Sequence, residues 1–354
     1  SATLLSSFLL IWVGKKIDDI NIFKFAFYVT ILLSFSCFFF SKISSIAFLF
    51  IAVFLMRFSG QGLMSHTATT TITRYFTKSR GKALSAGWFG LSTAEFILPI
   101  LIVYLLTIMS WQNVWVFISI LILIFLPLSS FFLIRKLDFD TREQVDSNVS
   151  KIKEIKQWKR IEVVKDYRFY VICLNMLAMP WIATGVFVFQ SYIAESKLWG
   201  DFVIPQSFMA YAIFSVITLL GSGFLIDKFS SKNLIIFMNI PLLLAAIVLI
   251  YFNNPISAFI FLGLIGVSNG LANVLGSSTW AEIYGVKYIG SIKALTTALM
   301  VFSTAFGTAL FGYMIDIGFL LNQIFYIVIT YLIVSILILY LIKDKIRPYQ
   351  VKII

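Results

Sequence analysis

The sequence predicts an all-α polytopic membrane protein, and both its composition and the grouping of its apolar residues support that class. Of its 354 residues, 60% are hydrophobic and only 12% are charged, whereas soluble domains carry about 25% charged residues. The apolar residues gather in runs of about 20 or more, the length that a helix needs to cross a bilayer. Because a helix satisfies its own backbone hydrogen bonds in lipid, we expect these runs to be membrane helices.

Five apolar runs precede a long polar stretch. We expect the chain to begin inside the first run, which is therefore short. Several of the others exceed the length needed to cross a bilayer, as tilted helices do. The helices predicted in this part are 1–13, 25–41, 45–75, 82–109 and 112–134.

Six more apolar runs follow the polar stretch. Pro180 predicts a kink in the first of them, because proline has no amide hydrogen to donate. The polar stretch, 135–166, is predicted to be a loop between an N-terminal bundle, 1–134, and a C-terminal bundle with a short tail, 167–354. The helices predicted in the second bundle are 167–195, 204–226, 233–252, 256–284, 291–315 and 322–342.

The basic residues indicate the orientation. All 28 Lys and Arg residues except Arg57, Lys42 and Lys197 fall on one side of the predicted helices, and the positive-inside rule makes this side cytoplasmic. The long loop and the C-terminus would then be cytoplasmic, in a protein of the inner (plasma) membrane. This asymmetry explains the net charge of +12, so the charge gives no indication of a nucleic-acid partner.

The sequence lacks the residue patterns of an enzyme or a metal site. Its two cysteines, Cys37 and Cys173, lie in apolar runs, and its single histidine is His66. It contains no cluster of His and Cys, no glycine loop for phosphate and no nucleophile beside a base. We therefore expect no cofactor, no metal and no enzymatic activity.

The two halves repeat short motifs at a constant offset of 209 residues. "GKKID" at 14–18 returns as "GFLID" at 223–227, and Gly81 returns as Gly290. Parallel repeats of this kind build secondary transporters.

These motifs resemble the cytoplasmic signature of the major facilitator superfamily. The second copy continues as "DKFSSK", similar to the family's pattern, whereas the first copy has Asp19 where a basic residue is usual. "AEIYGVKYIGSIKAL" is similar to the monocarboxylate-transporter-like branch in bacteria. The gate motif that the resemblance implies comprises Gly14, Asp18, Gly223, Asp227, Lys228 and Lys232.

The resemblance implies twelve helices in two six-helix halves that rock against each other, with both termini cytoplasmic. Eleven helices are predicted here, so we expect the family's first helix to be missing from this sequence. Asp18 and Asp227 are implied to clamp neighbouring helix ends on the cytoplasmic side. Solvated turns are the alternative, because exposed charge pairs contribute only about 0–1 kcal/mol.

Ionisable residues in mid-membrane are the main candidates for coupling. Arg57 and Glu95 lie near the middle of their predicted helices, where a charge is costly and usually functional. Arg57 keeps its proton, so it needs an anionic ligand or a carboxylate, and a structural ion pair with Glu95 is the alternative. Glu95 is the candidate proton carrier, unless it only neutralises Arg57 or the missing helix supplies the carrier. His66, near the cytoplasmic edge, is expected to be a hydrogen-bonded packing residue rather than a proton carrier.

Uncharged polar residues at helical spacing predict a central path. Asn269 and Asn273 form a stripe with Ser277, and Gln61 falls on the Arg57 side of its helix at about 100° per residue. Hydrogen bonding between helices is the alternative explanation of such residues. The predicted substrate-binding or coupling residues are Arg57, Gln61, Glu95, Asn175, Gln190, Asn269 and Asn273.

These inferences predict a monomeric secondary active transporter of the inner membrane. Its partners would be the lipid bilayer, a small organic anion such as a monocarboxylate, and a proton as the coupling ion. A proton-driven efflux antiporter and a membrane sensor without transport activity remain the alternatives.

Overall fold

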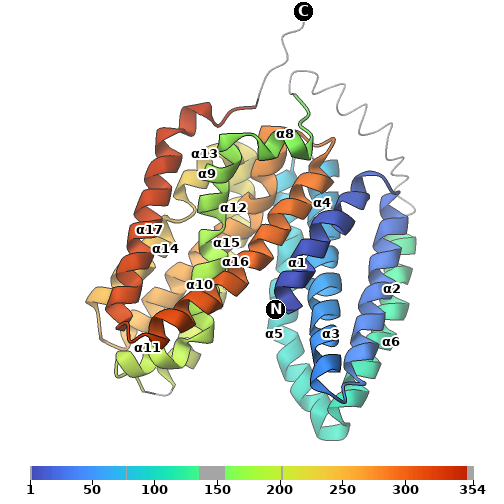
Figure 1. Ribbon diagram of the computed structural model, residues 1–354, viewed down its shortest axis with the longest axis horizontal. Helices are drawn as coiled ribbons and strands as arrows, with labels where there is room; N and C mark the ends of the chain where they lie inside the picture. The colour runs from blue at the N-terminus through green and yellow to red at the C-terminus, as the bar shows by residue number, and fades with distance from the viewer. Residues whose placement is uncertain (1, 77, 135–155, 201, 349–354) are drawn as a thin grey trace, which may run out of the picture.

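The computed structural model describes residues 2–76, 78–134, 156–200 and 202–348. The side chains of residues 95, 96, 99, 100, 103, 133 and 134 fall outside this description. Most of the predicted inter-bundle loop and the end of the tail are therefore not described either. Within the described ranges all regular elements are helical, and the long helices stand in two groups (Figure 1).

The first group of helices is built from the N-terminal part of the chain. Polar caps explain where two of its helices begin, because the first amides of a helix lack partners within it. The Asn21 side chain accepts a hydrogen bond from the Phe23 amide, and the Ser45 side chain accepts one from the Phe48 amide. The elements are α1 (Ala2–Val13), η1 (Gly14–Asp18), α2 (Ile22–Phe40), α3 (Ile46–Met56), η2 (Arg57–Met64), α4 (Ser65–Tyr75), α5 (Arg80–Ile108), α6 (Trp111–Ser129) and η3 (Ser130–Ile134).

The second group contains the remaining elements. Its first membrane helix is interrupted at Leu177, since Pro180 has no amide with which to continue the hydrogen-bond ladder. Gly285, with φ of 84°, ends the longest helix of this group in a conformation that suits glycine. The elements are α8 (Arg160–Val164), α9 (Tyr167–Met176), α10 (Ala178–Val188), α11 (Gln190–Ser196), α12 (Val203–Phe229), α13 (Ser231–Leu234), η5 (Ile235–Phe237), α14 (Ile240–Tyr251), α15 (Ile256–Tyr284), α16 (Ile289–Asp316), α17 (Leu321–Leu341) and η6 (Lys343–Lys345).

The predicted membrane class is confirmed. In the part of the chain that the structure describes, nine helical segments are long and apolar enough to cross a bilayer. The sequence predicts eleven spans, and two of these are not among the nine. The first is α1, whose 12 residues extend only about 18 Å at 1.5 Å per residue. The second is α5, which has several side chains outside the described residues.

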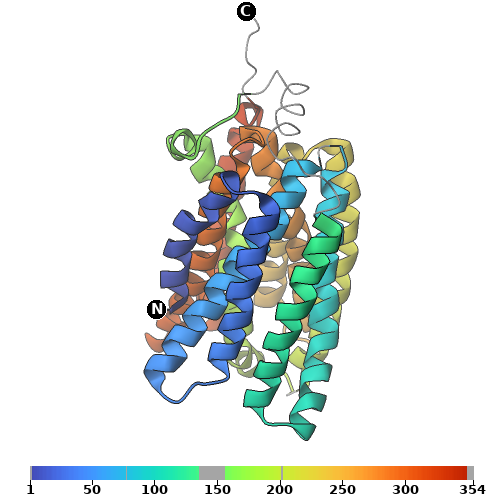
Figure 2. The same ribbon diagram turned by 90° about the vertical axis from the view of Figure 1, so that its right-hand side faces the viewer.

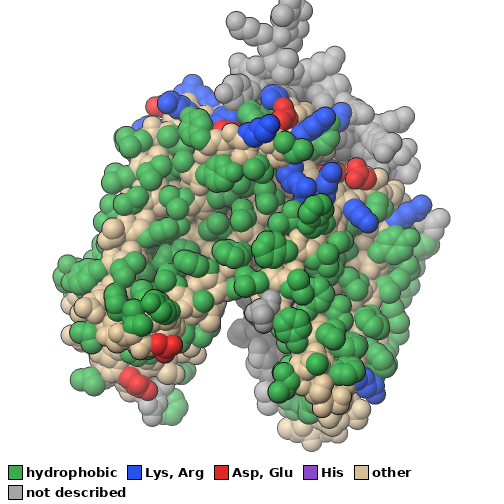
Figure 3. All heavy atoms as spheres, viewed as in Figure 1, with side chains coloured by type: hydrophobic (Ala, Val, Ile, Leu, Met, Phe, Trp, Pro, Cys, Tyr) green, Lys and Arg blue, Asp and Glu red, His purple; other side chains and the backbone are tan. Residues whose placement is uncertain are grey.

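The molecular surface matches a lipid environment. Large apolar side chains on the outside of the helices, such as those of Phe125, Phe224 and Leu341, are exposed. Lys and Arg residues gather at the end where α8 and α13 lie (Figures 1 and 3). An apolar flank with charges at its ends is what a bilayer requires, because lipid tails solvate apolar groups and exclude charges.

The two groups of helices meet at this basic end and diverge toward the other (Figures 1 and 2). At the meeting point Leu84 of α5 packs in one buried cluster with Leu219 and Ile226 of α12. The surface is hollowed between the groups at the opposite end (Figure 3). The fold therefore holds its two groups together at one end only.

Helices α12 and α15 pack closely through glycine, as small residues allow in membranes. A Cβ on Gly266 would lie 2.3 Å from the Tyr211 carbonyl oxygen, whereas a Cβ on Gly276 of the same helix would meet nothing within 4 Å. We predict that Gly266→Ala lowers the free energy of unfolding in detergent by about 1–3 kcal/mol through overpacking. Gly276→Ala is the matched control and should keep or raise the stability, because alanine favours helix by up to about 1 kcal/mol. Equal melting temperatures of the two variants would contradict this packing.

Candidate functional site

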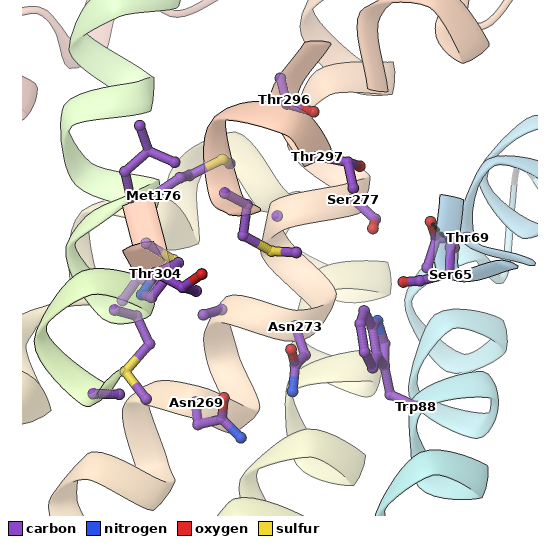
Figure 4. Close-up of a pocket in the computed structure, with 18 of the residues that line it drawn as sticks. Ser65, Thr69, Trp88, Met176, Asn269, Asn273, Ser277, Thr296, Thr297 and Thr304 are labelled. Atoms are coloured by element: carbon purple, nitrogen blue, oxygen red, sulfur yellow. Dashed lines mark hydrogen bonds between the residues drawn. The ribbon is translucent and has the colours of Figure 1, made fainter. Parts of the chain in front are cut away.

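A cavity of about 280 Å³, lined by both polar and apolar side chains, lies between the two groups of helices. Helices α4 and α5 contribute to it from one side, and α9, α10, α12, α15 and α16 contribute from the other. This volume lies just below the usual range of ligand pockets, roughly 300–1,000 Å³. Figure 4 labels ten of the residues that line the cavity, namely Ser65, Thr69, Trp88, Met176, Asn269, Asn273, Ser277, Thr296, Thr297 and Thr304.

The helix that the sequence predicts over 45–75 is continuous, but its middle is a π-helix, Arg57–Met64. Because a π-helix bonds residue i to i+5, the period of 100° per residue does not hold there. Gln61 lies in the cavity wall, followed by Ser65 and Thr69 of α4. Segments of π-helix often occur at functional sites.

Arg57 is exposed and does not line the cavity. Its Nη1 donates a hydrogen bond of 2.7 Å to Oε1 of Gln61. No carboxylate among the described side chains forms an ion pair with it. Arg57 is therefore linked to the cavity wall by its hydrogen bond to the Gln61 side chain. Glu95, its predicted partner, lies in α5 with a side chain outside the described residues.

The stripe predicted on α15 faces the cavity. Asn269 and Asn273 both line it (Figure 4). Asn269 Nδ2 also donates to Ser215 Oγ of α12 at 3.0 Å, so this residue both lines the cavity and joins two helices. Asn273 makes no hydrogen bond with another described residue, which leaves its donors and acceptor for a ligand or water.

The other two predicted polar residues lie elsewhere. Asn175 is fully buried, donates to the Ser335 carbonyl at 2.7 Å and accepts from Asn239 at 3.1 Å. It thus joins α9 to α17 and to the residue before α14. Such hydrogen bonding between helices is the alternative to cavity lining that the sequence leaves open. Gln190 begins α11, at the end of the molecule opposite α8 (Figure 1), and is not in the cavity wall.

His66 is a buried packing residue, as the sequence predicts. Its Nε2 lies 3.0 Å from the Gly14 carbonyl oxygen, and its Nδ1 lies 3.3 Å from Thr70 Oγ1. A carbonyl only accepts hydrogen bonds, so Nε2 carries the proton, and Nδ1 accepts from the threonine hydroxyl. Both ring nitrogens are satisfied in the neutral form.

One charged cavity residue, Lys293, is not among the site residues that the sequence predicts. The charge pattern places Lys293 with the cytoplasmic basic residues, but in the structure it is 3% exposed, lies within α16 and lines the cavity. The sequence contains an indication of this burial, because Lys293 falls inside the predicted membrane helix 291–315 and is followed by an apolar run.

The meeting point of the two groups contains the first gate-motif aspartate. The Asp18 carboxylate accepts hydrogen bonds from the amides of Gly290 at 3.0 Å and Ser291 at 2.6 Å, near the start of α16. Arg74 forms an ion pair with the same carboxylate. Burial raises the pKa of the Asp18 carboxyl above its ordinary value, while Arg74 and the two amides act in the opposite direction.

The second aspartate makes the same arrangement with the roles of the two groups exchanged, since its carboxylate belongs to the second group and its donors to the first. The Asp227 carboxylate accepts hydrogen bonds from the amides of Gly81 at 2.8 Å and Lys82 at 3.2 Å, near the start of α5. The acceptors and the donors are both related by the offset of 209 residues that the sequence shows. Each group of helices therefore caps one helix of the other group, where the helix dipole favours a negative charge.

The motif glycines permit the close approach that these caps require. A Cβ on Gly223 would lie 2.3 Å from Ser85 Oγ, and a Cβ on Gly14 would lie 2.9 Å from the Ala294 Cβ. The motif lysines contribute differently. Lys228 is exposed, and the Lys232 backbone amide donates to Glu282, which caps the short α13.

A family model described as Major Facilitator Superfamily matches residues 1–308 of this chain. No curated protein matches the sequence.

We predict that Asp227→Asn loosens the contact between α5 and α12. Ser85 is the reporter, because it is 3% exposed and donates to the Leu219 carbonyl across the contact at 2.8 Å. With Cys37 and Cys173 replaced by serine, a thiol reagent should modify Ser85→Cys about two- to thirtyfold faster in the Asp227→Asn variant. This range corresponds to roughly 0.3–2 kcal/mol for a charge at a helix N-terminus.

Asp344→Asn is the matched control, because it removes a carboxylate that is exposed at the same end of the molecule. It should leave the labelling rate unchanged. A labelling rate that Asp227→Asn also leaves unchanged would show that the cap does not hold the two groups together.

Proposed function

The chain belongs to the major facilitator superfamily, whose members are transporters, and on this premise we propose that it moves a small organic anion by rocking its two helix groups. The observation that carries the proposal is the cavity between these groups, which contains polar side chains and is closed at one end by two carboxylate caps related by the repeat. Rocking about a central site is how parallel repeats give alternating access.

The proposed orientation of the chain implies a state for this conformation. From the positive-inside rule we propose that the basic end, which holds both caps, faces the cytoplasm and that the host bilayer is the inner membrane. The cavity is then closed toward the cytoplasm, and the hollow between the groups faces outward (Figure 3). The conformation is thus outward-facing in this proposal.

The size and polar groups of the cavity support the proposal that the substrate is an organic anion such as a monocarboxylate. Its small volume suits a solute of a few heavy atoms, and its polar groups are mainly amides and hydroxyls, with Lys293 as the charged group. Gln61, Asn269 and Asn273 are the proposed contacts with the solute. Arg57 is proposed to orient the Gln61 amide through their hydrogen bond and to add a positive potential. The similarity of 281–295 to the monocarboxylate-transporter-like branch points to the same substrate class.

The proposed coupling ion is a proton, and its proposed carrier is Glu95. A carboxyl group in mid-membrane can bind a proton when it is desolvated and release it when Arg57 or water approaches. A protein working as a monomer would carry out the whole cycle with this cavity.

Transport by purified protein in vesicles tests the function. We expect uptake of radiolabelled lactate or acetate when the exterior is more acidic than the interior, and loss of accumulation after a proton ionophore. Glu95→Gln should keep lactate exchange between the two sides but lose accumulation driven by the pH gradient, because the amide cannot carry a proton. Glu195→Gln is the control, since that carboxylate is exposed outside the membrane helices.

Three outcomes would alter the proposal. Gradient-driven accumulation by Glu95→Gln removes Glu95 from coupling. Proton-driven movement of solute only out of the cytoplasm indicates an efflux antiporter. Absence of any solute movement, with saturable binding retained, indicates a sensor.

We predict that Arg57→Lys weakens lactate binding by about tenfold while the protein still inserts and melts normally. Lysine keeps the charge but loses the planar guanidinium that holds Gln61, and such a hydrogen bond contributes about 1.5–3 kcal/mol when one partner is charged. Equilibrium binding to purified protein measures this. Unchanged affinity in Arg57→Ala would reduce Arg57 to a structural residue.

A further inference from the structure

Lys293 is buried at the closed end of the cavity. It is 3% exposed and lies two residues beyond Ser291, whose amide donates a hydrogen bond to the Asp18 carboxylate. Its Nζ donates a hydrogen bond of 2.9 Å to Ser277 Oγ of α15. An ammonium group has three donors, and Ser277 is its one hydrogen-bond partner among the described residues.

The charge of Lys293 is not balanced by a described neighbour. No carboxylate in the described ranges forms an ion pair with it. Arg80, the charged side chain that acts on it, is also a cation. Burial of a single charge costs several kcal/mol unless an opposite charge or hydrogen bonds compensate it. The position therefore favours an anion in the adjoining cavity.

Other donors line the same cavity. The Trp88 Nε1 atom is buried and has no hydrogen-bond partner in the described structure. Ser65 of α4 and Ser277 of α15 face each other across the cavity, with Thr297 of α16 close by (Figure 4). The hydroxyls of Ser65 and Thr297 donate to no other described group, and Ser277 uses its oxygen to accept from Lys293. An anion would find a positive charge and several donors within one small space.

We propose that Lys293 binds the carboxylate of the solute, together with the hydroxyls of Ser65, Ser277 and Thr297. This site rests on the proposed transport function and names the part of the cavity that selects the anion. Charge-assisted hydrogen bonds to a carboxylate are roughly twice as strong as neutral ones. The carboxylate would also supply the opposite charge that Lys293 lacks.

The rest of the wall favours a short apolar tail on the carboxylate. Met176, Trp280 and Met300 line the same cavity beside the polar groups. A hydrated inorganic anion would leave these apolar side chains without a partner, whereas a short carbon chain covers them. The ligand class is thus a short-chain monocarboxylate, with chloride as the inorganic competitor to be tested.

Thermal unfolding of the purified protein tests this site without transport. The probes are acetate and lactate, with chloride and neutral lactamide as comparisons. We expect each carboxylate to raise the melting temperature of the wild type in a saturable manner, and neither comparison to do so. The expectation follows because a ligand that binds only the folded state stabilises it.

Lys293→Met is the decisive variant, and Lys287→Met is its matched control. Methionine has a similar length without the charge, so Lys293→Met should melt higher than the wild type without ligand. Its carboxylate affinity should fall by about tenfold or more, as expected for loss of a hydrogen bond to a charged group. Lys287 is exposed in the loop before α16, so Lys287→Met should behave as the wild type in both measurements.

The outcomes separate this site from the transport function. Carboxylate binding that Lys293→Met leaves unchanged refutes the site, and so does equal stabilisation by chloride or lactamide. A melting temperature below that of the wild type, with binding retained, makes Lys293 a structural residue. Vesicles that transport lactate while Lys293→Met binds it normally refute only the site, whereas failure of the wild type to move any carboxylate refutes the proposed function.

Discussion

The interaction on which the structure depends is the capping of two helix N-termini by carboxylates from the opposite group of helices. Asp18 accepts from the second and third residues of α16, and Asp227 does the same for α5. These amides have no partner within their own helices, and their dipoles attract a negative charge. Because the acceptor and donor of each cap lie in different groups, each cap forms only when the groups are in contact at this end.

The caps constrain the sequence around them. Each needs the backbones to approach closely, so Gly14 and Gly223 precede the aspartates, and Gly81 and Gly290 are donors. The buried cluster around Leu84 then excludes water from the contact. The two caps differ in one respect, because Arg74 pairs with Asp18 and the residue 209 positions later is Ile283. Contact at one end leaves the groups apart at the other, and the cavity lies between them.

Much of this fold could be predicted from the sequence, because helix length and the repeat offset are local or periodic signals. The offset of 209 even relates the partners of the two caps. The wall residues Gln61, Asn269 and Asn273 were predicted because a stripe of polar groups cannot face lipid. The position of Asn175 between helices could not be predicted, because a single polar residue is equally compatible with a cavity wall and with a hydrogen bond between helices. The π-helix at Arg57–Met64 and the burial of Lys293 depend on packing between helices that are distant in sequence.

The energies of the two caps suit the proposed transport cycle, in which the closed end must also open. A charge at a helix N-terminus contributes about 0.3–2 kcal/mol, so two caps hold the closed end with a few kcal/mol at most. A shift from 1:99 to 99:1 between two states needs about 5.5 kcal/mol of differential binding. Helix α16 carries the amides that bind Asp18 and, two residues later, the lysine that lines the cavity. Any movement of α16 therefore alters the cap and the cavity together, and in the proposed transport cycle interactions of this modest strength would allow a solute in the cavity to change which state is favoured.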